Sequence, residues 1–69
     1  MRVLFAERLQ LLRKEFNYTQ GDLAEKLGTT QRRISYLEAG KVEPDLETLI
    51  QLASLFSVST DYLIGYKEY

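Results

Sequence analysis

The stretch that decides the fold is residues 20–39, with the sequence QGDLAEKLGTTQRRISYLEA. Near its middle, Gly28 can end one helix in a left-handed conformation, and Thr30 can cap the start of the next. Beyond that point, Ile34 and Leu37 recur at helical spacing and are expected to face the core. The stretch therefore predicts two short helices joined by a turn so tight that they cross steeply.

The outward face of the second helix, expected over residues 31–39, follows from its inward face. Once Ile34 and Leu37 point into the core, four hydrogen-bonding side chains remain outside, and none of them is acidic. They are Gln31, Arg32, Ser35 and Tyr36. Glutamine and arginine can contact base edges in the major groove of DNA in bidentate fashion. The pattern predicts that this helix enters the major groove of double-stranded DNA.

Three further polar positions beside these helices are candidates for phosphate contacts. Arg33, like Arg32, lies in a first helical turn, where a cation opposes the helix dipole unless a phosphate lies nearby. Gln20, together with free backbone amides, stands at the start of the first helix of the pair. Lys41 follows the second helix on its other flank. Each of these side chains also has an ordinary interpretation as a solvated surface residue.

Two charged residues beside buried positions have a structural interpretation instead. Arg13 follows Leu12, and Glu38 follows Leu37. We expect Arg13 and Glu38 to form an ion pair between the first and third helices. The loss of one partner from a buried pair can cost about 3–5 kcal/mol.

Apolar spacing predicts three more helices and no strands. A first helix is expected over residues 3–16, a fourth from the N-cap Asp45, and a short fifth from about Ser59 to Gly65. The expected inner face of the first helix comprises Phe5, Leu9, Leu12 and Phe16, and that of the fourth comprises Leu46, Leu49, Ile50, Ala53 and Phe56. The sequence thus predicts an all-α single domain over residues 1–69, with a core at about 5–65.

Composition excludes several classes of protein. The chain has no cysteine and no histidine, so it can hold neither a disulfide nor a Cys/His metal site. No carboxylate pair faces an expected pocket, and we therefore expect no catalytic residues, no cofactor and no enzyme activity. No apolar run is long enough for a membrane span, and the first residues do not form a signal peptide. Together with the lack of disulfides, this favours a cytoplasmic protein.

The distribution of charge matters more than its total. The net charge of −1 argues weakly against nucleic acid as a partner. Residues 31–41, however, carry three basic side chains and one acidic side chain, whereas residues 42–69 carry one basic and five acidic. Because phosphate binding responds to the local field, the basic segment agrees with the predicted DNA-binding helix.

The pattern Thr19-Gln20-x-x-Leu23-Ala24-x-x-Leu27-Gly28-x-Thr30-x-x-x-Ile34-Ser35-x-x-Glu38-x-Gly40 resembles the helix-turn-helix of the Cro and phage-repressor (XRE-type) regulators. The similarity continues through Pro44 and Leu49 to Gly65 and so covers nearly the whole chain. It implies a compact five-helix lambda-repressor-like domain with its helix-turn-helix at helices 2 and 3. It also implies base contacts at Gln31, Arg32, Ser35 and Tyr36, phosphate contacts at Gln20, Thr30, Arg33 and Lys41, and a buried Arg13–Glu38 pair.

The same resemblance implies a function. Members of the family usually regulate transcription by binding two-fold symmetric operators as homodimers, so a repressor is the expected function. The dimer contact would involve Phe56, Val58, Tyr62 and Tyr66. Tyr36 departs from the smaller or more polar groups common at its position, so no base preference carries over.

An alternative function remains open at this point. An antitoxin domain or another protein-interaction module could be built on the same fold. The acidic fourth helix and apolar positions outside the predicted inner faces (Val3, Leu4, Leu11 and the segment 66–69) would serve such a partner contact.

Overall fold

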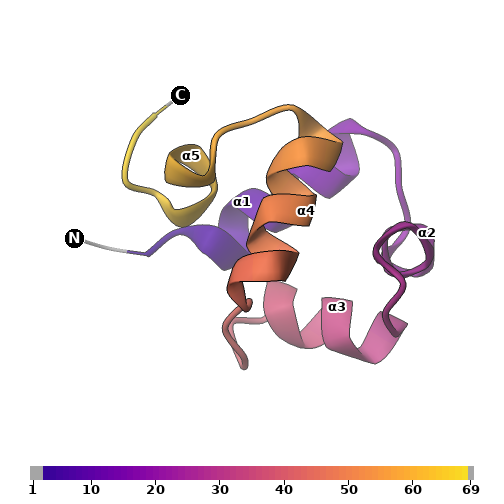
Figure 1. The fold of residues 1–69 in the computed structure, drawn as a ribbon. Coiled ribbons are helices and arrows are strands. Elements are labelled where there is room, and N and C mark those ends of the chain that lie inside the picture. Colours follow the sequence, from indigo (N-terminus) through magenta and orange to yellow (C-terminus); the bar gives the residue numbers. More distant parts are fainter. Residues whose placement is uncertain (1–2, 69) are drawn as a thin grey trace.

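The computed structural model describes residues 3–68, which form five helices joined by short turns (Figure 1). They are α1 (Phe5–Glu15), α2 (Gln20–Leu27), α3 (Gln31–Glu38), α4 (Leu46–Phe56) and α5 (Thr60–Ile64). The predicted all-α, five-helix class is confirmed, and none of residues 3–68 is in a strand. Met1, Arg2 and Tyr69, which belong to the predicted single domain, lie outside the described residues. In the described part, every helix is too short or too polar to cross a membrane.

Side-chain caps fix where four of the helices begin. Thr19, Thr30, Asp45 and Ser59 each accept a hydrogen bond from the backbone N–H three residues further along the chain. Each such cap typically contributes about 1 kcal/mol. The N-caps expected at Thr30 and Asp45 are thereby confirmed, and Ser59 caps the short helix that was expected to begin near it. Local chemistry alone therefore determines the starts of α2, α3, α4 and α5.

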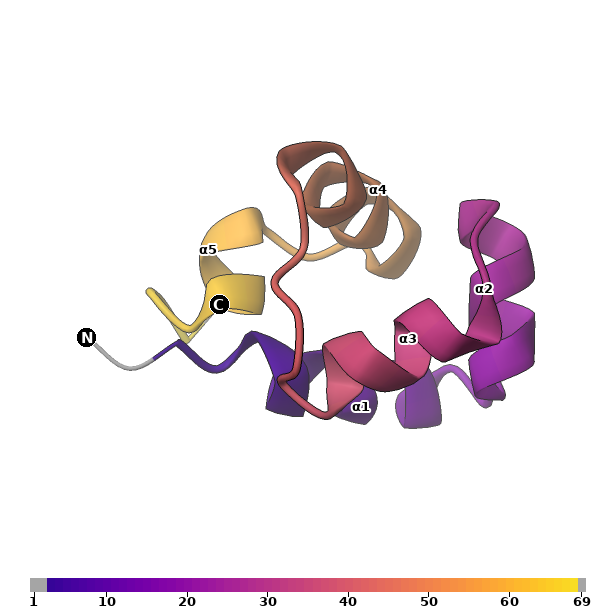
Figure 2. The same cartoon turned by 90° about the horizontal axis from the view of Figure 1, so that it is seen from below.

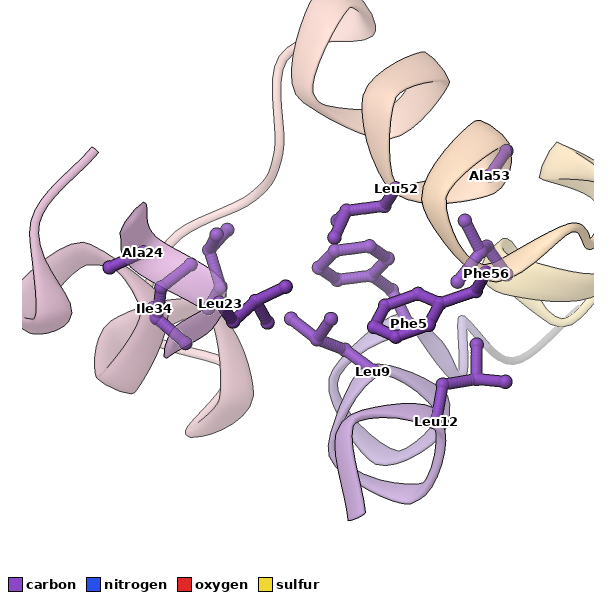
Figure 3. Close-up of a cluster of buried hydrophobic side chains, with 11 residues drawn as sticks. Phe5, Leu9, Leu12, Leu23, Ala24, Ile34, Leu52, Ala53 and Phe56 are labelled. Carbon is purple, nitrogen blue, oxygen red and sulfur yellow. The ribbon is translucent and has the colours of Figure 1, made fainter. Parts of the chain in front are cut away.

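All five helices contribute side chains to one apolar core. In Figure 3, side chains from α1, α2, α3 and α4 converge, with Leu9 and Leu23 pointing toward each other. α2 lies at the end of the molecule opposite α5, and α1 packs against both α3 and α5 (Figures 1 and 2). Six core side chains have no accessible surface: Leu9, Leu23, Ile34, Leu37, Leu52 and Leu63. The core thus supports α3 from one side and leaves its other side open.

Three apolar residues expected on inner faces are exposed instead. Phe16 is 41% exposed because α1 ends at Glu15 and the chain turns away through Asn17, which has a positive φ of 59°. Leu46 and Ile50 are 77% and 62% exposed because they lie four residues apart on the outer face of α4. The prediction of inward positions was wrong for Leu46 and Ile50, whereas Phe16 still packs its ring edge-to-face against the buried Phe56, with ring centroids 5.0 Å apart. Val3 and Leu11, which lay outside the predicted inner face of α1, are exposed.

A close backbone contact joins the start of α1 to the end of α5. The Leu4 N–H donates to the Ile64 carbonyl at 3.1 Å. Gly65 follows with φ +88°, and a Cβ on it would lie 2.9 Å from Leu4 Cβ and Cγ. Two features therefore require glycine at position 65: its left-handed backbone conformation and the nearness of Leu4.

Arg8 strengthens the same contact, a role that the sequence pattern did not indicate. Arg8 is only 7% exposed, and its guanidinium lies 4.2 Å from the centre of the Tyr62 ring. It donates to the carbonyls of Tyr62 and Lys67 and to the carboxylate of Glu68. Arg8 thus holds the turn after α5 against α1.

The two requirements at Gly65 can be separated by comparison with Gly28. Gly28 has φ +69° but nothing within 4 Å of an added Cβ. We expect Gly28→Ala to lower the free energy of unfolding by about 1–2 kcal/mol, the cost of the left-handed conformation alone. Gly65→Ala should cost about 1–3 kcal/mol more, because the new methyl group overlaps Leu4. Urea unfolding of both variants measures the difference, and equal losses would contradict the close contact.

Acid should weaken the cap of α4. Hydrogen bonds from the Thr48 side chain and backbone lower the pKa of Asp45 below its ordinary value of 3.8, with a smaller decrease from the charge of Arg33. A carboxyl whose pKa is depressed by folding stabilises the fold above its ordinary pKa and loses this effect as pH falls through the folded value. Asp45→Asn keeps a capping oxygen but does not titrate. The denaturant midpoint of unfolding of this variant should therefore fall less, below about pH 4, than the midpoint of the unaltered protein. If the two midpoints fall in parallel with pH, the prediction is refuted.

Candidate nucleic-acid interface

The turn between α2 and α3 determines which side of α3 faces solvent. Gly28 adopts a left-handed conformation and ends α2, while the Thr29 N–H donates back to the Ala24 carbonyl at 2.9 Å. Thr30 then caps α3, so only three residues separate the two helices. The helices cross steeply (Figures 1 and 2), and Ala24 lies beside Ile34 in the core (Figure 3).

The four residues predicted to contact bases share the outward face of α3. Ile34 and Leu37 are fully buried beneath it. Gln31 and Arg32 are exposed, whereas Ser35 and Tyr36 are half-buried. Gln31 reaches back over α2, where its Oε1 lies 3.7 Å from the position that a Cβ on Gly21 would occupy. The structure therefore brings the four side chains together on one face, and their contact with bases stays a prediction.

Two cations surround Tyr36 on this face. Arg32 Nε and Nη2 donate to the Tyr36 hydroxyl at 3.1 and 3.0 Å. Arg32 Cζ lies 5.3 Å from the centre of the Tyr36 ring, and Lys41 Nζ lies 5.4 Å from it. Within residues 3–68, no carboxylate forms an ion pair with Arg32 or Lys41. The positive charge of both side chains is therefore available to an anion.

An ion pair lies behind α3, between that helix and α1. Arg13 Nε donates to Glu38 Oε2 at 2.6 Å, and Arg13 Nη2 donates to Glu38 Oε1 at 3.1 Å. Arg13 also donates to the Tyr18 carbonyl at 2.9 Å, and the Gln20 amide donates to Glu38 Oε1 at 3.2 Å. The Glu38 side chain is only 2% exposed. The hydrogen bond to Glu38 raises the pKa of Arg13 above its ordinary value.

The predicted phosphate contacts lie at three places around α3. Gln20 stands at the start of α2, with its amide nitrogen engaged by Glu38. Thr30 Oγ1 accepts the Arg33 N–H at 3.2 Å, and the charge of Arg33 acts on Asp45. Lys41 is exposed beyond the end of α3, where its backbone N–H donates to the Tyr36 carbonyl at 2.9 Å. Thr30 and Lys41 thus flank α3 at opposite ends.

The expected dimer residues do not all lie on the surface. Phe56 is 3% exposed and belongs to the core, so its side chain is not accessible to a partner. Val58 and Tyr62 are half-buried, and Tyr66 is 62% exposed.

Within residues 3–68 we find no group of three or more histidine, cysteine or acidic side chains placed to hold a metal ion.

Two capped helices joined by a tight turn, the second presenting hydrogen-bond donors to solvent, define a helix-turn-helix domain. Comparison with known families agrees: the family model described as "Helix-turn-helix" matches residues 9–63. The chain belongs to this family.

Relatives and solved structures extend the comparison. The chain is 43% identical over 61 residues to the SPbeta prophage-derived uncharacterized HTH-type transcriptional regulator YonR of Bacillus subtilis, a match that spans 88% of this chain and 56% of the relative. A transcriptional regulator from Listeria innocua has a TM-score of 0.92 at 38% identity, over 100% of this chain and 64% of that one. The P22 c2 repressor in complex with a synthetic operator has a TM-score of 0.84 at 30% identity, over 91% and 96% of the two chains. The chain thus spans little more than half the length of YonR.

The Arg13–Glu38 pair should contribute strongly to stability. Glu38→Gln leaves the Arg13 guanidinium with no carboxylate partner, and we expect a loss of about 3–5 kcal/mol in the free energy of unfolding. Glu25→Gln, at an exposed position on α2, is the matched control and should change it by less than about 0.5 kcal/mol. Urea unfolding measures both. Because the two partners interact, replacing Arg13 and Glu38 together by methionine should cost less than the sum of the single losses.

Proposed function

We propose that this domain is a sequence-specific, double-stranded-DNA-binding transcriptional regulator that acts as a repressor by occupying an operator. The observation that carries the proposal is the outward face of α3, where Gln31, Arg32, Ser35 and Tyr36 lie above the buried Ile34 and Leu37. An α-helix with its side chains is about 10–12 Å wide, which suits the major groove at about 12 Å. Repression of this kind blocks access to DNA and needs no chemical step.

The flanking residues support the same position on DNA. With α3 in the groove, Thr30 and Lys41 stand at its two ends, where the sugar–phosphate strands rise on either side. The start of α2, with Thr19 and Gln20, carries backbone N–H groups and the positive end of a helix dipole, both favourable to phosphate. We propose phosphate contacts at Gln20, Thr30, Arg33 and Lys41.

The P22 c2 repressor supports the proposal by its similarity, since it was solved with an operator. Two-fold symmetric binding by a homodimer is a further part of the proposal. The exposed Tyr66 and the half-buried Val58 and Tyr62 are the residues expected at that contact. A repressor that acts on the cell's own DNA works in the bacterial cytoplasm, which is the proposed location.

In vitro selection from random DNA tests the proposed function. We expect enrichment of a palindromic site that the protein binds far more tightly than unrelated DNA. Arg32→Ala should reduce the discrimination between that site and unrelated DNA by about 1–3 kcal/mol. A protein that retains its fold yet enriches no sequence would rule out the proposal.

Salt dependence tests the phosphate contacts separately. Each neutralised phosphate releases counterions, so the logarithm of the binding constant should fall steeply and linearly with the logarithm of salt concentration. Lys41→Gln should reduce the magnitude of this slope by about 1 and weaken binding about equally for all sequences. The matched control is Lys14→Gln, at an exposed position of α1. An affinity that stays flat from low to high salt would contradict the proposed contacts.

A protein-interaction module is the second candidate, and the exposed Leu46 and Ile50 on α4 favour it. Such a function would be insensitive to Arg32→Ala and sensitive to Ile50→Ser. DNA binding by α3 would instead be sensitive to Arg32→Ala and insensitive to Ile50→Ser, so the same two variants distinguish the two candidate functions.

A further inference from the structure

One arrangement on α3 goes beyond a general fit to DNA: the contact between Arg32 and Tyr36. The two residues lie four apart and therefore on the same face of the helix. Both Arg32 Nε and Nη2 donate to the single phenolic oxygen of Tyr36, at 3.1 and 3.0 Å. One edge of the guanidinium is therefore held by the Tyr36 hydroxyl before any DNA is bound.

These two hydrogen bonds leave one particular edge of the guanidinium free. A guanidinium has five N–H donors in a planar fork. The edge formed by Nε and Nη2 is turned toward Tyr36, so the end edge, with one N–H on each of Nη1 and Nη2, faces outward. These two N–H groups are parallel and both are donors. They match a partner with two adjacent acceptors.

Only one base edge in the major groove has two adjacent acceptors. Guanine presents N7 and O6, both acceptors. Adenine places a donor beside its N7, thymine has a single acceptor, and cytosine presents a donor. The free edge of Arg32 therefore matches guanine and no other base.

Tyr36 is itself held in place. Arg32 Cζ lies 5.3 Å from the centre of its ring, within the range of cation–π attraction. The Tyr36 side chain is half-buried and, with Thr30, Arg33 and Val42, lines a shallow hollow beside α3. A long side chain anchored on such a support loses less freedom on binding than one that is free in solution.

We propose that Arg32 reads a guanine in the operator and that Tyr36 is a positioning residue that holds Arg32 for this contact. The proposal rests on the proposed function, since it concerns the DNA that α3 binds. It gives α3 a preferred base, which the family resemblance does not provide. It also gives Tyr36 a role through Arg32 rather than through a base contact of its own.

The experiment measures affinities of four proteins for the selected site and for sites changed at each guanine. The proteins are the unaltered chain and its Arg32→Ala, Tyr36→Phe and Lys41→Ala variants. Tyr36→Phe keeps the ring and removes only the hydroxyl that accepts from Arg32. The probes replace one guanine at a time by adenine, or by 7-deazaguanine, which lacks the N7 acceptor. Thermal unfolding checks that every variant is folded.

The unaltered protein should prefer guanine at one position by about 5- to 150-fold. Arg32→Ala should abolish this preference there, and 7-deazaguanine should then cost nothing further. Tyr36→Phe should reduce the preference several-fold at the same position and leave the adenine site nearly unchanged. Lys41→Ala should weaken binding to every site by the same factor.

Two results would overturn the inference alone: a selected site with no guanine sensitive to Arg32→Ala, or a Tyr36→Phe variant whose guanine preference equals that of the unaltered chain. In either case the protein would still bind a specific site, and the proposed function would stand. Failure to enrich any site would overturn both.

Discussion

The ion pair between Arg13 and Glu38 determines how α3 sits on the rest of the molecule. A carboxylate that is only 2% exposed requires a charged partner and further hydrogen bonds, because an unpaired buried charge is very unfavourable. Arg13 meets this need with two hydrogen bonds to Glu38 and reaches the Tyr18 carbonyl with a third. The pair therefore joins α1, the segment before α2, and α3. Since Glu38 faces inward, the direction of the opposite side of α3 is fixed as well.

The same network reaches the side proposed to face DNA through Gln20. Its amide donates to Glu38 Oε1 at 3.2 Å, so a residue at the start of α2 is tied to the inner side of α3. A side-chain amide held by its nitrogen keeps its oxygen and its second N–H available. The ion pair thus supports both helices of the helix-turn-helix, and a change at Glu38 would disturb the relative position of α2 and α3 as well as stability.

The sequence predicted the local features well and, apart from the Arg13–Glu38 pair, the long-range ones poorly. Thr19, Thr30, Asp45 and Ser59 act as caps through contacts three residues away, so the pattern that encodes them is short. The outward face of α3 followed because its two inward apolar residues leave only one possible face. A cap or a single stripe of apolar residues is enough to make such a prediction.

The failures have a physical reason too. α4 carries apolar residues on more than one face, so spacing alone could not show that Leu46 and Ile50 point outward. Arg8 binds partners 54 to 60 residues away, two of them backbone carbonyls, and no sequence pattern marks a carbonyl as the partner of an arginine. Arg32 and Tyr36 are only four residues apart, yet the hydrogen bonds between them depend on side-chain rotamers that sequence spacing does not specify.

The distribution of ion pairs explains how a chain of net charge −1 can present a positive face. Arg13 is paired with Glu38, Arg8 with Glu68 and Lys67 with Asp61, and all three pairs lie away from the outward side of α3. Arg32 and Lys41 instead gather around the ring of Tyr36, where within residues 3–68 no carboxylate pairs with either. An aromatic ring can hold two cations close together without neutralising their charge, whereas a carboxylate would neutralise it. The total charge therefore says little about this surface, because Tyr36 concentrates positive charge at the site where the proposed partner carries negative charge.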